Sequence, residues 1–247
     1  MALDLGPPAL AYVVAAVLLA GIVRGYSGFG FSALVMLSVS LVVAPARLLP
    51  VVLLLEIAAS AYMIPAVVQA VDWRRLGLLL AGIAVSTPVG VHLLARLPED
   101  AARVMVSALV LAAGGAIAAG LSVPDRGGRL LPVSTGLLAG GANGVAGVGG
   151  LVVVAMFLST GAAVATTRAT LVALLFATDV VAIGAAGWQG LVGWPTLLAF
   201  GVLVLPLFAG IAIGGRLFLG TTPDRFRRFV LGILLLLALA GIVRAAL

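Results

Sequence analysis

Hydrophobic residues form ten apolar stretches, with five before and five after the polar segment 123–132 (VPDRGGRLLP). A helix rises about 1.5 Å per residue, so about 20 residues cross the roughly 30 Å hydrocarbon core of a bilayer. We therefore predict an all-α polytopic membrane protein with about eight to ten membrane helices. The apolar stretches cover residues 8–23, 28–44, 46–68, 75–97, 100–120, 130–143, 146–161, 165–187, 194–219 and 223–246.

The composition supports a membrane protein. Hydrophobic residues make up 64% of the 247 positions and charged residues only 9%, against about 25% charged in soluble domains. Soluble enzymes, nucleic-acid-binding proteins and disordered proteins are therefore excluded. The net charge of +6 is the balance of 14 basic and 8 acidic residues. The basic residues are all arginine and lie mostly between apolar runs, where they suit the headgroups of the lipid bilayer. The chain has no cysteine, and we expect no cofactor and no metal site.

The chain reads as two repeats, a first transmembrane half over 1–122 and a second over 123–247. Landmarks recur 119–121 residues apart, which is typical of internal duplication. A polar break and an odd number of crossings in each half predict inverted repeats, with helices broken by glycine, or re-entrant hairpins, near the midplane. The matched pairs are Arg24 with Asn143, Gly28 with Gly147, Gly30 with Gly149, Arg47 with Arg168, and Trp73 with Trp194.

Arginine is distributed unevenly between the two sets of loops. Segments 69–76, 121–130 and 220–228 carry seven arginines between them, and the opposite set carries three. Cytoplasmic loops are enriched in Lys and Arg. The bias therefore predicts that these three segments are cytoplasmic and that both termini lie outside.

A glycine-rich turn falls early in each half: RGYSGFGFSAL at 24–34 and NGVAGVGGLVV at 143–153. If the helix breaks there, a new helix begins inside the membrane with free N–H groups and a positive dipole end, which suits an anion. We therefore expect a substrate site at both turns. The alternative is close helix packing through small residues alone. The candidate residues are Arg24, Ser27, Gly28 and Gly30 in the first half, and Asn143, Gly147 and Gly149 in the second.

Two further arginines open the spans that follow these turns. Arg47 and Arg168 occupy similar places in the two halves, and inverted symmetry predicts that they flank one central cavity. A guanidinium binds two oxygens of an anion at once, and Thr167 beside Arg168 adds a hydroxyl donor. The alternative is that both arginines extend to the membrane surface as interfacial anchors.

Glu56 and Asp179 lie well inside the same two spans. A charge within the membrane is costly and marks a functional site by default. We consider two roles for these acids, either proton coupling or pairing with a buried arginine.

One enzymatic interpretation is possible. The segment GYSG at 25–28 has the form used by intramembrane serine proteases, and His92 is the single histidine of the chain. Ser27 and His92 would then form the catalytic dyad. Against this, the second turn has no serine in the matching place, and a protease gives no reason for a duplication.

The chain resembles the TauE/SafE sulfite exporter family (the TSUP group) over essentially its whole length. The resemblance rests on GYSGFGFSALVML (25–37), GLLAGGANGVAGVGGLVVVAMF (136–157), APARLLP (44–50) and ATTRATL (165–171), and it is greatest to the subgroup with an S-G-F-G first motif. It implies a bacterial cytoplasmic-membrane carrier that exports sulfite, sulfoacetate or related organosulfonates. The inverted repeats and the breaks near the midplane predict that this carrier works by alternating access. An anion channel or another small-anion permease is the alternative. The specific anion, the coupling and the oligomeric state, a homodimer included, stay open.

Overall fold

A computed structural model describes residues 6–40, 42–118, 128–159 and 162–222, together with 225, 228, 229, 232 and 236. Every regular element in this part of the chain is a helix. The first half contains α1 (Pro7–Ser27), α2 (Phe31–Val39), α3 (Pro45–Val67) with the short 3₁₀ turn η1 (Val68–Ala70), α4 (Trp73–Arg96) and α5 (Glu99–Ala118). The second half contains α6 (Leu130–Ala146), α7 (Gly149–Ser159), α8 (Val164–Trp188) and α9 (Trp194–Phe218).

Five of these helices are long and apolar enough to cross a membrane: α1, α3 with η1, α4, α8 and α9. The predicted all-α membrane architecture is therefore confirmed. The proposed boundary between the halves at 122 and most of the expected last span at 223–246 lie outside the described residues.

Two helix bounds around the breaks match at an offset of 119 residues. α1 ends at Ser27 and α6 at Ala146, and α3 begins at Pro45 and α8 at Val164. This register pairs Arg47 with Thr166. The pairing of Arg47 with Arg168 expected from the sequence was therefore two residues out of register. The extra two residues lie later, because α8 has 25 residues and α3 has 23.

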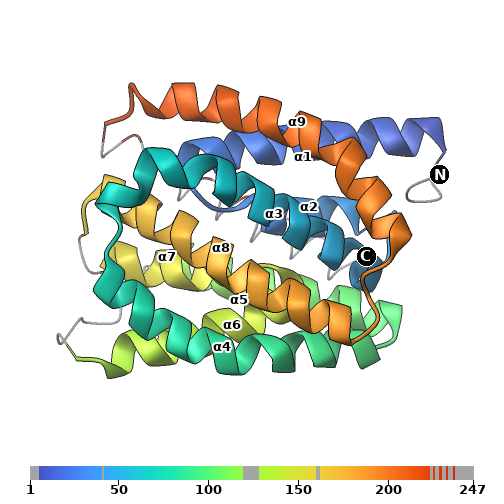
Figure 1. Cartoon of the computed structure of the whole chain (residues 1–247), viewed down its shortest axis with the longest axis horizontal. Coiled ribbons are helices and arrows are strands. Elements are labelled where there is room, and N and C mark those ends of the chain that lie inside the picture. The colour runs from blue at the N-terminus through green and yellow to red at the C-terminus, as the bar shows by residue number, and fades with distance from the viewer. Residues whose placement is uncertain are drawn as a thin grey trace.

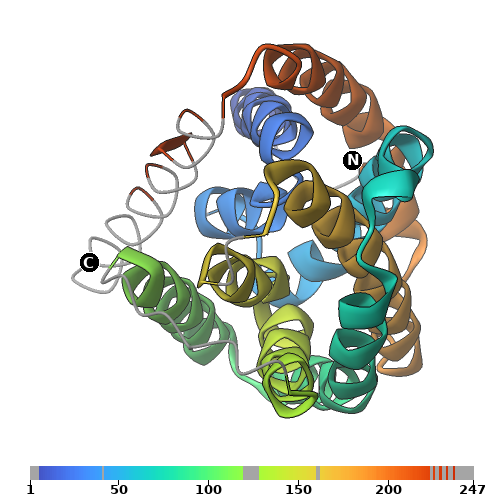
Figure 2. The ribbon, with the colours of Figure 1, turned by 90° about the vertical axis from the view of Figure 1, so that its left-hand side faces the viewer.

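Helices that hold matching places in the two halves, α1 with α6 and α4 with α9, pack against helices of the other half. α1 packs on α9 and α4 packs on α6, while α3 contacts α8 between these pairs. Seen end-on, the two pairs lie on opposite sides of the bundle (Figure 2). The connection from α3 to α4 lies at the left end of Figure 1, and the connection from α8 to α9 lies at the right end. The two matching hairpins therefore point in opposite directions.

Glycine lets the exchanged pairs approach backbone to backbone. A Cβ added at Gly25 would overlap the carbonyl oxygen of Ile211, and one added at Gly136 would overlap that of Leu79. Membrane helices associate closely through such small residues. Much of the glycine in α1, α4, α6 and α9 therefore serves packing.

The two glycine-rich turns break the helices as predicted. Gly28 and Gly30 adopt φ of 83° and 89°, and Gly147 adopts 68°, a left-handed conformation that glycine reaches without a steric cost. The helices that follow have nine residues in α2 and eleven in α7. They span about 14 and 16 Å, or about half of the hydrocarbon core.

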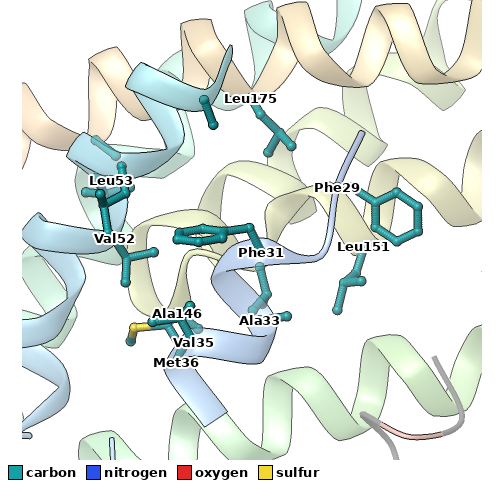
Figure 3. Packing of buried hydrophobic residues seen from close by; sticks show 14 of the residues in the cluster. Phe29, Phe31, Ala33, Val35, Met36, Val52, Leu53, Ala146, Leu151 and Leu175 are labelled. Carbon is teal, nitrogen blue, oxygen red and sulfur yellow. The ribbon is translucent and has the colours of Figure 1, made fainter. Parts of the chain in front are cut away.

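The half-length helices are packed in the centre of the protein by large apolar side chains. Phe29, Phe31, Leu151 and Leu175 are buried in one cluster (Figure 3). They come from the first break, α2, α7 and α8, so this buried cluster joins elements of both halves.

Candidate functional site

Arg24 lies in the last turn of α1 and is completely buried. Its Nη1 donates a hydrogen bond to the carbonyl oxygen of Gly28, and its Nη2 donates to Ser60 Oγ at 2.6 Å. Its Nε lies 3.1 Å from Glu56 Oε2. The guanidinium thus links the first break to the middle of α3.

Glu56 connects this arginine to α2. Its Oε1 accepts a hydrogen bond from the backbone N–H of Ser32 at 3.2 Å, in the first turn of α2. The amino end of a helix carries a partial positive charge and favours an anion. In the structure, the carboxylate of Glu56 therefore occupies the anion-binding place predicted at the first break.

The Arg24–Glu56 pair lies at mid-depth. Glu56 is eleven residues from each end of α3, which spans Pro45–Val67. At about 1.5 Å per residue, it lies about 16 Å along the helix from either end. Charges at this depth are costly and mark functional sites in membrane proteins.

The second break has its own buried pair. Asn143 Nδ2 donates to Asp179 Oδ1 at 2.9 Å, and both residues are buried. Asn143 Oδ1 and Asp179 Oδ2 have no hydrogen-bond partner among the described residues. Asp179 also interacts electrostatically with Glu56 and Arg24, so the polar groups of the two breaks lie within electrostatic reach of each other.

Arg168, on α8, contacts the residues of the first break. Its Nη2 donates to the carbonyl oxygen of Gly25 at 2.7 Å, and its guanidinium carbon lies 4.2 Å from the centre of the Phe218 ring. A Cβ added at Gly28 would lie 2.9 Å from Arg168 Cγ. Thr167 beside it is buried. These contacts explain why the first break needs glycine on the side facing α8.

The structure does not bring Arg47 together with Arg168. Arg47 is exposed at the first turn of α3, whereas Arg168 lies in the first turns of α8. α3 and α8 run in opposite directions, so these turns lie at opposite ends of the bundle (Figure 1). The expected two-arginine clamp is therefore not formed, because antiparallel helices place their amino-terminal turns at opposite ends of the pair.

Gly149 differs from the other three candidate glycines. Gly28, Gly30 and Gly147 have positive φ, but Gly149 does not and begins α7. A Cβ there would overlap the carbonyl oxygen of Ala139 and lie 2.8 Å from the Cβ of Asn143. Glycine is therefore needed at 149 for a close approach to α6 rather than for a turn.

The suggested Ser27–His92 dyad is not formed. Ser27 Oγ lies 2.8 Å from the carbonyl oxygens of both Val23 and Phe29. His92 Nδ1 instead lies 2.8 Å from Gln189 Nε2. Ser27 thus bonds to backbone carbonyl groups on both sides of the break, and His92 links α4 to the end of α8. These contacts overturn the protease interpretation.

Sequence analysis missed Ser60 and Ser32, which contact Arg24 and Glu56. For Ser60, the sequence does contain a signal, which is an equal spacing in the two halves. Ser60 follows Arg24 by 36 residues, and Asp179 follows Asn143 by 36 residues. Ser32 contributes only its backbone N–H, which carries no residue-type signal.

Comparisons with known proteins agree with this architecture. The profile of the family described as "Sulfite exporter TauE/SafE" matches residues 13–241. The chain is 28% identical over 215 residues to the "Probable sulfite/organosulfonate exporter TauE" of Cupriavidus necator, covering 85% of this chain and 84% of that protein. No solved structure matches the chain. The chain belongs to the TauE/SafE sulfite exporter family, and it is a multi-pass transporter of the inner membrane rather than an enzyme.

Proposed function

We propose that this protein carries a small sulfur oxyanion, sulfite or an organosulfonate such as sulfoacetate, out of the cell. The observation that supports this most is the completely buried guanidinium of Arg24 at the first helix break. A guanidinium presents planar paired donors that match two oxygens of a sulfonate or sulfite. The relative from Cupriavidus necator is described as a probable exporter of the same anions.

The proposed mechanism is alternating access between two inverted repeats, 1–122 and 123–247. It is supported by the matched helix bounds, the opposed hairpins and the exchanged helix partners. Broken helices near the midplane are typical of such carriers. With the cell interior negative, one negative charge moving outward gains about 2.3 kcal/mol per 100 mV, which favours export.

The proposed orientation places 69–76 in the cytoplasm. This segment carries Arg74 and Arg75 at the start of α4, in line with the enrichment of arginine in cytoplasmic loops. The chain has no cysteine, so a single cysteine introduced here reports its side directly. Labelling of intact cells by a membrane-impermeant maleimide would contradict the orientation.

Counterflow of labelled sulfite in proteoliposomes tests the proposed function. A carrier gives saturable uptake that is accelerated by unlabelled sulfite inside the vesicle, and a channel gives neither. Arg24→Lys keeps the positive charge but loses the paired donors, so we expect counterflow to fall sharply. Arg47→Lys, at the exposed end of α3, is the matched control and should transport normally. Flux without acceleration would favour the channel alternative, and no flux of any sulfur oxyanion would refute the proposal.

A further inference from the structure

We infer that Glu56 is a built-in competitor for the substrate: the transported anion displaces its carboxylate from Arg24, and Glu56 takes up a proton when this happens. This inference rests on the proposed function and adds its coupling ion. It gives Arg24 two alternate partners, the Glu56 carboxylate in the absence of substrate and the oxyanion in its presence.

The place that Glu56 occupies has the donors that an oxyanion requires. One carboxylate oxygen lies against Arg24 and the other accepts the N–H of Ser32 at the start of α2. A carboxylate and a sulfonate both present two oxygens to a guanidinium and to a helix amino end. The Glu56 side chain therefore fills the site in the manner of a tethered substrate.

The contacts of Glu56 are loose for a buried ion pair. Arg24 Nε lies 3.1 Å from Glu56 Oε2, but neither atom has a partner with hydrogen-bond geometry among the described residues. The bond from Ser32 N is 3.2 Å long, whereas charge-assisted bonds of this kind are about 2.7–2.9 Å. A free anion that aligns well with Arg24 Nε and with the Ser32 N–H can therefore compete for this place.

The charges around Glu56 leave a displaced carboxylate without a partner. Arg24 on α1 is the cation beside it, and Asp179 on α8 is a second acid within electrostatic reach. Arg168, the cation on α8, lies within electrostatic reach of Arg24 and donates its Nη2 hydrogen bond to the carbonyl oxygen of Gly25. α2 has no charged residue, α9 carries only Arg216 in its last turn, and the charges of α5 lie within its first five residues. An unpaired buried carboxylate costs several kcal/mol.

Proton uptake removes this cost. When the anion takes Arg24, the Glu56 carboxylate accepts one proton from solvent and becomes a neutral carboxylic acid. The charge of the site is then unchanged, because one negative charge has arrived with the anion and one has been neutralised. When the anion leaves, Glu56 releases the proton and returns to Arg24. Transport would then move one proton with each monovalent anion, so no net charge would cross the membrane. The gain from the membrane potential would then apply only to an anion that crosses without a proton.

Calorimetric titration with methanesulfonate tests the inference. This anion keeps one negative charge throughout the neutral range, so any proton taken up belongs to the protein. Titrations at one pH in buffers of different ionisation heat count the protons. We expect about one proton per bound anion in the wild type, and an affinity that falls about tenfold for each unit of rising pH. Binding without proton uptake would overturn the inference and leave the proposed function intact.

The variant Glu56→Gln removes the competitor. We expect it to bind methanesulfonate roughly tenfold or more tightly, with no proton uptake. Unchanged or weaker binding would show that Glu56 does not compete with the anion. Asp72→Asn, an acid at the start of α4, is the control and should keep the proton count of the wild type. A proton count lost in Asp179→Asn and kept in Glu56→Gln would also overturn the inference. The wild-type titration tests the proposal even if Glu56→Gln fails to fold.

Discussion

The two helix breaks share one backbone plan but carry different chemistry. In both, a helix ends at a glycine with positive φ and a half-length helix follows. The polar residue one turn before the break is Arg24 in the first half and Asn143 in the second. Arg24 reaches Ser60 and Asn143 reaches Asp179, each 36 residues further along. The two halves thus share this backbone plan at their breaks but differ in the charges placed there.

The place of Glu56 shows the difference best. At the offset of 119 residues, its counterpart is Leu175. The Glu56 carboxylate accepts a hydrogen bond from the backbone N–H of Ser32 at the start of α2. At the start of α7, the Leu175 side chain lies about 3.3 Å from where a Cβ at Gly150 would be. One half-helix therefore begins against a carboxylate, and the other begins against an apolar side chain.

This difference indicates a division of labour. The two breaks supply two helix amino ends, but among the described residues only the first has a guanidinium and a carboxylate that accepts its N–H. Anion binding is then expected at the first break, and the Asn143–Asp179 pair of the second break serves mainly to hold α6 on α8. The following predictions test this division.

The largest effect is expected from Gly28→Val. A valine at a φ of 83° is strained, and its Cβ would meet Arg168 Cγ at 2.9 Å, so the first break cannot close normally. We expect sulfite counterflow to be abolished while the protein still inserts into the membrane. Gly184→Val is the matched control, because nothing lies within 4 Å of its position on α8. Normal counterflow by Gly28→Val would show that the break is not needed for transport.

Arg24→Lys and Asn143→Ala compare the two breaks directly. Loss of a charge-assisted hydrogen bond costs about 1.5–3 kcal/mol, so Arg24→Lys should weaken sulfite binding roughly 10- to 150-fold. Asn143→Ala should change the affinity by less than about threefold, because Asn143 contacts Asp179 and not Glu56. Equal losses of affinity, measured by calorimetry, would mean that both breaks hold the anion.

Substitutions at the second break should lower the stability of the protein rather than its affinity for sulfite. Asn143→Ala leaves Asp179 Oδ1 buried without its donor, which costs about 1–3 kcal/mol. We expect a lower midpoint of thermal unfolding in detergent. Asp179→Asn keeps a side-chain oxygen that can accept the same bond and should lose less. A midpoint that is unchanged in Asn143→Ala would remove the structural role assigned to this pair.

The smallest effects concern the two arginines near helix ends. Arg168→Ala loses the bond to Gly25 and the contact with the Phe218 ring, so stability should fall by about 1–2 kcal/mol. Arg47→Ala, on the exposed turn of α3, should change stability by less than about 0.5 kcal/mol. Sulfite affinity should change little in either variant. A tenfold loss of affinity in Arg168→Ala would restore this residue to the substrate site.

The apolar pattern and the glycine-rich turns were enough to predict the class, most helix positions and the two breaks. Helices in a membrane must satisfy their own backbone, so hydrophobic length alone locates a span. Glycine with positive φ is likewise a local requirement, and it is met at Gly28, Gly30 and Gly147. The buried positions of Glu56 and Asp179 also followed from their place within apolar runs.

Only the tertiary structure decided which of these residues meet. Arg24, Glu56 and Ser60 come together because the last turn of α1 lies beside the middle of α3. Arg47 and Arg168 each lie near the start of the long helix that follows a break, but α3 and α8 run in opposite directions and place them at opposite ends of the bundle. Ser32 acts through a backbone N–H, which every residue except proline carries. Residue type and spacing therefore determined which charged side chains lie within the membrane-spanning helices, and helix packing determined which of them contact each other.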